Sequence, residues 1–175
     1  LLDISSIDAG AIQPHCHVFT IDTILNRIRV EFEPLAQEKG LTLRIVSCSA
    51  MIYSDEEIAT RILRNLVANA VRYTDRGKIL VGCRRRGKQL RIEVHDTGCG
   101  IAPDKQRAIF EEFYQINNKE RNRAKGLGLG LAIVQRLAKL VGTHVVLNSK
   151  LGLGSLFAFD LPRFVPQTVQ ALTSY

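Results

Sequence analysis

A glycine-rich segment at residues 124–131 carries the strongest chemical signal in the sequence. It reads Ala-Lys-Gly-Leu-Gly-Leu-Gly-Leu, and an amphipathic stretch over 129–140 follows it directly. Backbone N–H groups that no side chain covers, together with the positive end of a helix, suit an anion such as phosphate. The segment lacks the Gly-Lys-[Ser/Thr] of a Walker loop and the later third glycine of a dinucleotide fingerprint, so a plain flexible turn remains open.

Two asparagines one helical turn apart form a second candidate site. Asn65 and Asn69 stack on one line along the border of an apolar stripe, with Arg72 and Tyr73 one turn further on. Asparagine is a poor helix former, so the pair is locally unfavourable unless the amides have partners. Mg²⁺ would be such a partner, since it takes one or two protein oxygens and the rest from phosphate and water. Nearby backbone is the alternative partner.

A carboxylate at the end of a predicted strand forms a third candidate. The alternation of residues 88–95 places Asp96 on the buried face, where it needs a donor. The exocyclic amine of adenine would supply one, whereas guanine presents a carbonyl at the corresponding edge. Residues 97–100, Thr-Gly-Cys-Gly, predict a bend that another group can approach closely. The alternative is a carboxylate that caps this turn.

A basic loop is predicted between the aromatic segment and the glycine-rich segment. Residues 115–125 contain almost no apolar side chain, and their cations are Lys119, Arg121, Arg123 and Lys125. Such a loop is expected to be mobile and to close as a lid over phosphates.

The other candidates have plainer interpretations. His15 and His17 have no further ligands nearby in the sequence, so we expect surface residues rather than a metal site. The aromatic side chains of Phe110, Phe113 and Tyr114 are expected to form a small satellite core.

Composition favours one domain in a reducing cytoplasm. The 175 residues are 46% hydrophobic, which is enough for a core, and no stretch approaches the ~20 apolar residues of a membrane span. The four cysteines are scattered without a Cys-x-x-Cys pair, so they predict neither a zinc ribbon nor a disulfide framework: Cys16, Cys48, Cys83 and Cys99.

The net charge of +7 fits a site for a polyphosphate or a nucleic-acid surface. The densest basic cluster, Arg84, Arg85, Arg86 and Lys88, falls at the tip of a predicted hairpin and has no aromatic platform. Solvated charge is therefore the expected explanation, and no nucleic-acid partner is expected.

Periodicity predicts the elements that position these residues. Helices are expected over about 21–39, with a kink at Pro34, over 54–73, with Ser54 and Glu57 as a capping box, and over 129–141. A short helix is expected near 103–108. Strands are expected over 41–46, 77–86, 88–95, 144–149 and 156–161. Residues 1–12 look like the end of a longer helix, 13–163 like one domain, and 164–175 like a linker.

Five segments in this order resemble the motifs of the ATP-binding catalytic domain of bacterial sensor histidine kinases. Asn-Leu-Val-Ala-Asn-Ala at 65–70 resembles the N box, Asp-Thr-Gly-Cys-Gly-Ile at 96–101 the first glycine box, and Phe-Glu-Glu-Phe at 110–113 the F box. Residues 126–131 resemble the second glycine box and 152–157 the last one. The superfamily also contains DNA gyrase, heat-shock chaperone and mismatch-repair ATPases, and the resemblance covers about 21–163.

The resemblance implies an α/β (α+β) two-layer sandwich, the Bergerat fold, with a mixed sheet covered on one face by three long helices. It implies that Asn69 holds Mg²⁺, that Asn65 assists at the phosphates, that Arg72 reaches the phosphate chain and that Tyr73 flanks the base. Asp96 would bind the adenine amine. The remaining ATP contacts implied are Gly98, Gly100, Ile101, Lys125, Gly126, Leu127, Gly128, Leu129, Gly130 and Leu131.

The resemblance also bears on the reaction. Superfamily members that hydrolyse ATP have a glutamate as general base where this chain has Asn65, which cannot take a proton at neutral pH, so efficient hydrolysis is not expected. The phosphoryl acceptor in histidine kinases is a histidine in a His-Glu-x-x-x-Pro-like motif of a dimerisation domain. None of the four histidines has such surroundings, so we expect this chain to bind ATP without phosphorylating itself.

The implied partners are the dimerisation domain of the same protein, whose last helix would end in 1–12, and a response regulator or receiver domain. The parent protein would be a cytoplasmic homodimer, with membrane anchoring left open. A serine or protein kinase of the same fold, such as anti-sigma factor kinases or mitochondrial dehydrogenase kinases, is the alternative acceptor class.

Overall fold

A mixed five-stranded sheet, in the order β2-β4-β5-β7-β6, carries the other elements in the computed structural model, which describes residues 12–114 and 128–166. Strand β2 pairs parallel with β4, and all other neighbours are antiparallel. The strands are β2 (Thr42–Ile45), β4 (Lys78–Arg86), β5 (Gln89–Asp96), β6 (Val145–Lys150) and β7 (Gly154–Pro162). These match the five predicted strands to within a few residues at each end.

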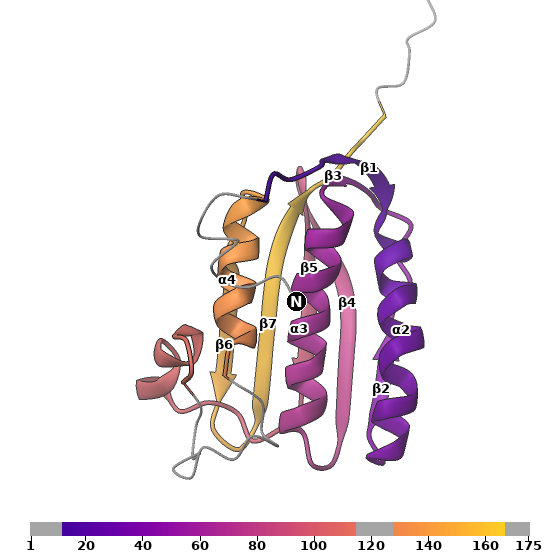
Figure 1. Cartoon of the computed structure of the whole chain (residues 1–175). Helices are drawn as coiled ribbons and strands as arrows, with labels where there is room; N and C mark the ends of the chain where they lie inside the picture. The colour runs from indigo at the N-terminus through magenta and orange to yellow at the C-terminus, as the bar shows by residue number, and fades with distance from the viewer. Residues whose placement is uncertain (1–11, 115–127, 167–175) are drawn as a thin grey trace, which may run out of the picture.

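Three helices cover one face of this sheet (Figure 1). They are α2 (Ile21–Glu38), α3 (Glu56–Tyr73) and α4 (Gly130–Leu140), and α3 lies between the other two. Each helix packs an apolar stripe against the core, because side chains three and four positions apart share one face. The predicted two-layer α/β sandwich is therefore confirmed.

The core lies between helices and sheet. The α3 side chains Ile62, Leu63 and Val67 are fully buried, as are Ile79 in β4 and Ile92 in β5. The sequence spacing also predicts Leu35 in the apolar stripe of α2, but this side chain is 46% exposed and does not belong to the stripe. The helix runs through Pro34 without interruption.

A second sheet of two short strands closes one end of the sandwich. Strand β1 (His17–Thr20) pairs antiparallel with β3 (Met51–Ser54). The sequence predicts neither strand, because neither His-Val-Phe-Thr nor Met-Ile-Tyr-Ser alternates apolar with polar side chains. In β1 only Phe19 is buried.

The start of α3 differs from the predicted capping box. The N-cap is Asp55, whose Oδ1 accepts a hydrogen bond of 2.8 Å from the backbone N–H of Ile58. The Ser54 hydroxyl is buried and has no hydrogen-bond partner among the described residues. Ser54 is paired in β3, which moves the cap one residue onward, so the predicted capping box is wrong.

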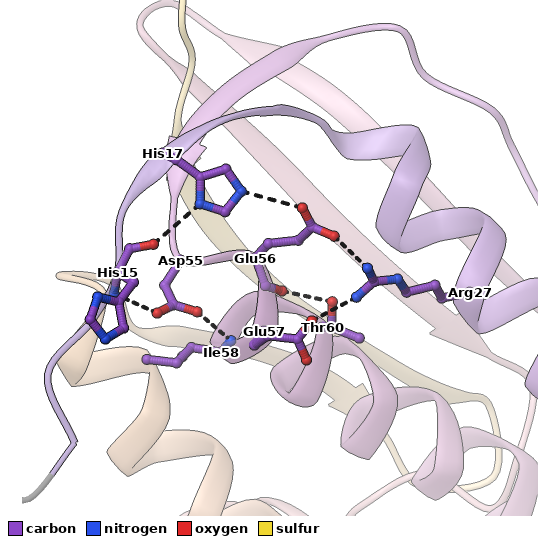
Figure 2. Close-up of polar contacts among 8 residues, drawn as sticks. All are labelled: His15, His17, Arg27, Asp55, Glu56, Glu57, Ile58 and Thr60. Atoms are coloured by element: carbon purple, nitrogen blue, oxygen red, sulfur yellow. Dashed lines mark hydrogen bonds and ion pairs between the residues drawn. The ribbon is translucent and has the colours of Figure 1, made fainter.

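Polar contacts attach the chain that leads into β1 to this helix start (Figure 2). Asp55 Oδ2 accepts a hydrogen bond of 2.7 Å from the backbone N–H of His15, and His17 Nε2 lies 3.4 Å from a Glu56 oxygen. Arg27 of α2 bridges Glu56 and Glu57, at 2.8 Å each. Within the described residues, no three His, Cys, Asp or Glu side chains come together as a metal site.

The segment after β5 is less regular than predicted. Instead of one short helix, it forms two 3₁₀ turns, η1 (Pro103–Lys105) and η2 (Ala108–Phe110). The predicted aromatic satellite core is wrong, because Phe113 is 69% exposed. Phe110 instead packs edge-on against Phe157 of β7, with ring centroids 6.5 Å apart.

Three predictions fall outside the described residues in whole or in large part: the helix end at 1–12, the basic lid at 115–125 and the linker at 164–175. No helix in the described part of the chain is both long and apolar enough to cross a bilayer.

Candidate functional site

The bend that follows β5 is packed against the last turn of α3. The backbone N–H of Cys99 donates to the carbonyl of Tyr73 at 3.3 Å. A Cβ on Gly98 would collide with that carbonyl and would lie 2.9 Å from Asp96 Oδ1 and 3.0 Å from Thr74 Oγ1. Only glycine allows this approach, so the Thr-Gly-Cys-Gly bend brings the carboxylate of β5 next to the end of α3.

Asp96 is the last residue of β5 and lies partly buried beside this bend. Its Oδ1 accepts a hydrogen bond of 2.8 Å from the backbone N–H of Gly98, so the predicted turn-capping role is present. Burial raises the pKa of the carboxyl above its usual value, against the lowering effect of hydrogen bonds from Gly98 and Ser155 and of the nearby His95. The hydrogen bonds to Asp96 therefore do not offset the cost of its desolvation in full. A further hydrogen-bond donor would stabilise the charged carboxylate.

A buried hydroxyl next to this carboxylate is a further candidate that the sequence pattern does not indicate. Thr74, just after α3, is fully buried, and its Oγ1 has no hydrogen-bond partner in the described part of the chain. Such an orphaned group indicates a missing partner, such as a ligand or an ordered water. A threonine after a helix is common, so nothing in its sequence context singles it out.

The β6–β7 turn supports the same bend from the other side. Gly100 has a φ of +64°, and a Cβ there would collide with the backbone of Lys150. The Ser149 hydroxyl accepts from the backbone N–H of Ile101 at 2.8 Å and donates to the carbonyl of Gly154 at 3.0 Å. The first and last predicted glycine boxes are thus packed on each other, and Ser149 joins them.

The predicted asparagine pair faces the start of α4. A Cβ on Gly130 would lie 3.3 Å from Asn65 Oδ1 and 4.0 Å from the amide atoms of Asn69. Asn65 Nδ2 donates to the carbonyl of Arg61 at 2.9 Å. The amide nitrogen of Asn65 therefore has its partner within α3, and this bond fixes the orientation of the amide oxygen. The N box and the second glycine box therefore lie next to each other.

A lysine that directly follows α2 holds the end of α3. Lys39 Nζ donates to the carbonyls of Val71, Arg72 and Thr74 at 2.8, 3.0 and 3.2 Å, which a helix C-terminus favours because those carbonyls lack intrahelical partners. The side chains of Arg72 and Tyr73 are exposed on this turn. Lys39 is a second residue that the sequence analysis missed.

The second glycine box is described only in part. Lys125, Gly126 and Leu127 lie outside the described residues. The carbonyl of Gly128 accepts from the backbone N–H of Phe113 at 3.1 Å, which joins the F box to this segment. Leu129, the N-cap of α4, and the first two helical residues, Gly130 and Leu131, are partly buried.

The predicted residues therefore form two groups along α3. Asn65 and Asn69 face the start of α4 at one end, and Tyr73 adjoins the bend of Asp96 at the other. Asn65 and Tyr73 are eight positions apart on the helix, a distance of about 12 Å at 1.5 Å per residue. This length fits a ligand with an anionic end at the amides and a hydrogen-bond donor at the carboxylate.

A known protein family matches most of the described chain. The family described as histidine kinase-, DNA gyrase B-, and HSP90-like ATPase matches residues 54–164, which include α3, the bend after β5 and α4. The chain belongs to this family. Membership agrees with the resemblance of the sequence motifs and with the three-helix sandwich.

Similar proteins are histidine kinases. An uncharacterized sensor-like histidine kinase of Rhizobium meliloti (strain 1021) is 35% identical over 165 residues, which are 93% of this chain and 31% of that protein. Hybrid signal transduction histidine kinase B of Dictyostelium discoideum is 31% identical over 177 residues, which are 96% of this chain and 9% of that protein.

Solved structures agree with this fold. The crystal structure of full-length ShkA in complex with AMPPNP superposes with a TM-score of 0.82 at 33% identity, over 94% of this chain and 34% of that one. The histidine kinase AdeS of Acinetobacter baumannii, at 20% identity and a TM-score of 0.74, shares the fold. The chain thus spans about a third or less of the curated relatives described here.

Proposed function

We propose that this chain is the ATP-binding catalytic domain of a two-component sensor histidine kinase. In this proposal residues 13–163 form the domain, and it donates the γ-phosphoryl group of ATP to a histidine outside this chain. The partly buried carboxylate of Asp96, next to the orphaned hydroxyl of Thr74, is the observation that carries the proposal. The exocyclic amine of adenine would supply the donor that this carboxylate needs, whereas guanine presents a carbonyl acceptor at the corresponding edge.

The proposed site for the phosphates of ATP is formed by Asn65, Asn69 and Gly130. An amide oxygen held next to an uncovered helix start is a suitable environment for Mg²⁺ and phosphate oxygens. Asn69 would hold the cation, Asn65 would assist at the phosphates and Arg72 would reach the phosphate chain. When bound, Mg²⁺ would neutralise charge that develops on the transferring phosphoryl group.

The other residues of the proposed site would act by positioning the nucleotide. Tyr73 would flank the base, and the bend at Gly98, Gly100 and Ile101 would shape the base pocket. Lys125, Gly126, Leu127, Gly128, Leu129, Gly130 and Leu131 would follow the phosphates. Because Asn65 cannot accept a proton, water would be activated poorly, and transfer would depend on an incoming nucleophile placed by domain docking.

The partners belong to the proposal as well. The ShkA structure contains AMPPNP, and the relatives are named as sensor or hybrid signal transduction kinases, which supports a nucleotide ligand and a signalling role for this chain. We infer a dimerisation domain in the same protein, a homodimeric parent, and a response regulator or receiver domain as the next acceptor. The domain would work in the cytoplasm, where ATP is available.

The test is a transfer assay on the whole protein that contains this chain, with ATP labelled at the γ-phosphate. The proposal predicts label that survives alkali and is released by acid, which is the behaviour of phosphohistidine. Asn69→Ala should remove the label while leaving the melting temperature within a few degrees. Acid-stable label would instead indicate a serine kinase of the same fold, and an unlabelled protein that hydrolyses ATP freely would contradict the proposal.

A further inference from the structure

Two cysteines that are 35 positions apart in the sequence are brought together at the edge of the sheet. Cys83 lies in β4, and Cys48 lies in the connection between β2 and β3. The parallel pairing of β2 with β4 ends at Ile45 and Val81, and the backbone N–H of Val46 still donates to the carbonyl of Val81 at 2.9 Å. Each cysteine stands two residues beyond this last contact, so the register itself places them side by side.

The two cysteine side chains adjoin one another at a partly exposed place in the fold. The electrostatic influence of Cys48 is among the causes that raise the pKa of the Cys83 thiol, in agreement with the adjacency that the register gives the two side chains. Both cysteines are partly buried, both pack against the hydrophobic core, and both are free thiols.

Helix α2 holds the connection that carries Cys48. Asp22 Oδ1 accepts a hydrogen bond of 3.2 Å from the backbone N–H of Cys48, and Arg29 donates to the carbonyl of Ile45 at 3.0 Å. These two contacts hold the connection between β2 and β3 against α2. The proximity of the thiols is therefore built into the fold, as a bridge between them requires.

We propose that Cys48 and Cys83 are a reversible redox pair, which a small-molecule disulfide such as oxidised glutathione converts into an intramolecular disulfide. Disulfides in a reducing compartment are usually transient or redox-sensing, and a pair of adjacent thiols is the arrangement that such a role needs. The proposal is independent of ATP binding.

The reaction is a thiol–disulfide exchange in two steps. Burial, the contact with Cys48 and the nearby charges of Asp22 and Glu93 raise the pKa of the Cys83 thiol, so Cys48 is the first nucleophile. Its thiolate attacks one sulfur of oxidised glutathione, the disulfide bond breaks, and one glutathione leaves and takes up a proton. Cys83 then gives up its proton and attacks the Cys48 sulfur, which releases the second glutathione. Two electrons pass from the protein to the reagent.

The bridge would enclose the element that carries the candidate nucleotide site. The closed loop runs from Cys48 to Cys83 and contains β3 and all of α3, and therefore Asn65 and Asn69. A cross-link over such a loop lowers the entropy of the unfolded chain. The oxidised protein should therefore melt at a higher temperature than the reduced protein, by roughly 5–15 °C.

The experiment uses a Cys16→Ser/Cys99→Ser background, because both of these cysteines are exposed and could cross-link molecules. The protein is incubated with oxidised glutathione, the remaining thiols are alkylated, and the intact mass and melting temperature are measured. We expect both thiols to be lost without a glutathione adduct, a higher melting temperature, and full reversal by dithiothreitol.

Single substitutions in that background separate the two steps. Cys83→Ser should stop at a glutathione adduct on Cys48, and Cys48→Ser should react little at Cys83. If serine disrupts the packing, alanine at the same positions provides the same comparison. Retention of both thiols in the parent background, or a glutathione adduct that never closes to the bridge, would overturn the proposal.

Discussion

Gly130 at the start of α4 lies so close to α3 that a Cβ on it would stand 3.3 Å from Asn65 Oδ1. This separation is tighter than ordinary van der Waals contact between a side-chain carbon and an oxygen. The space between the two residues is therefore just wide enough for the amide, and a methyl group would compete with any ligand of that oxygen. This close approach joins the N box, which contains Asn65, to the second glycine box, which contains Gly130. The proposed phosphate site depends on both motifs.

Gly130→Ala should weaken the binding of Mg²⁺ and AMPPNP about tenfold, or about 1.4 kcal/mol, because the methyl group displaces the Asn65 amide. Stability should stay equal or rise, since alanine is favoured over glycine within a helix. Calorimetric titration and thermal melting measure the two effects.

Gly82→Ala is the matched control for this change. Gly82 lies in β4, where a Cβ would meet only the Cβ of Val46, at 4.0 Å. Nucleotide affinity should be unchanged in this variant. An equal loss of affinity in both variants, or unchanged affinity in Gly130→Ala, would contradict the role given to Gly130.

Asp55→Ala should lower the free energy of unfolding by about 1–3 kcal/mol, because it removes the cap of α3 and the acceptor for His15. Ser54→Ala removes a buried hydroxyl without a hydrogen-bond partner in the described structure and should be neutral or stabilising. Urea denaturation of the two variants distinguishes them. If Ser54→Ala were the more harmful change, the capping box expected from the sequence would be restored.

Asp96→Asn should make the fold more stable at neutral pH. Burial raises the folded-state pKa of this carboxyl, so the charged form subtracts stability above that pKa, and the penalty disappears as pH falls through it. The advantage of Asp96→Asn should therefore shrink as pH is lowered from about 8 toward about 4. Urea titrations across this range test it; a variant less stable than wild type at neutral pH would show that the carboxylate is a structural group.

Asp160 should behave in the opposite way. Arg91 donates two hydrogen bonds to this carboxylate, at 2.9 and 2.7 Å, and this pairing lowers its folded-state pKa. The stability it contributes is present above the unfolded-state pKa of about 3.9 and is lost as pH falls through the lower folded-state value. Wild type should therefore lose stability more steeply than Asp160→Asn below about pH 4. Parallel pH profiles would mean that the pair contributes nothing.

The residues that sequence reasoning placed correctly are those whose spacing has one structural outcome. A helix brings positions 65 and 69 into line, and the alternation of β5 turns Asp96 toward the core. The glycines of the boxes are required where backbone or side chains approach closely, as at Gly98 and Gly130. Local rules therefore predicted α3, the hairpin of β4 and β5, and the places of Asn65, Asn69 and Asp96 on these elements, while the binding roles of the three residues stay predictions.

The residues that sequence reasoning did not find take their roles from contacts between segments that are distant in the sequence. Ser149 is 48 positions from Ile101, and Lys39 is 32 from Val71, so no local pattern reveals either contact. The cap of α3 was misplaced because β1 pairs with β3 and takes Ser54 into a strand. Phe113 has a φ of 61° and turns outward, which the sequence of an aromatic cluster does not indicate.

The central claim is that this chain binds an adenine nucleotide through Asp96, and calorimetric titration with Mg²⁺ and AMPPNP tests it most directly. The account predicts saturable binding of AMPPNP by the wild type, at least ~10-fold weaker binding by Asp96→Asn, and equally poor binding of the corresponding GTP analogue. Equal affinity for both nucleotides, full affinity in Asp96→Asn, or no binding by a cooperatively folded wild type would contradict it.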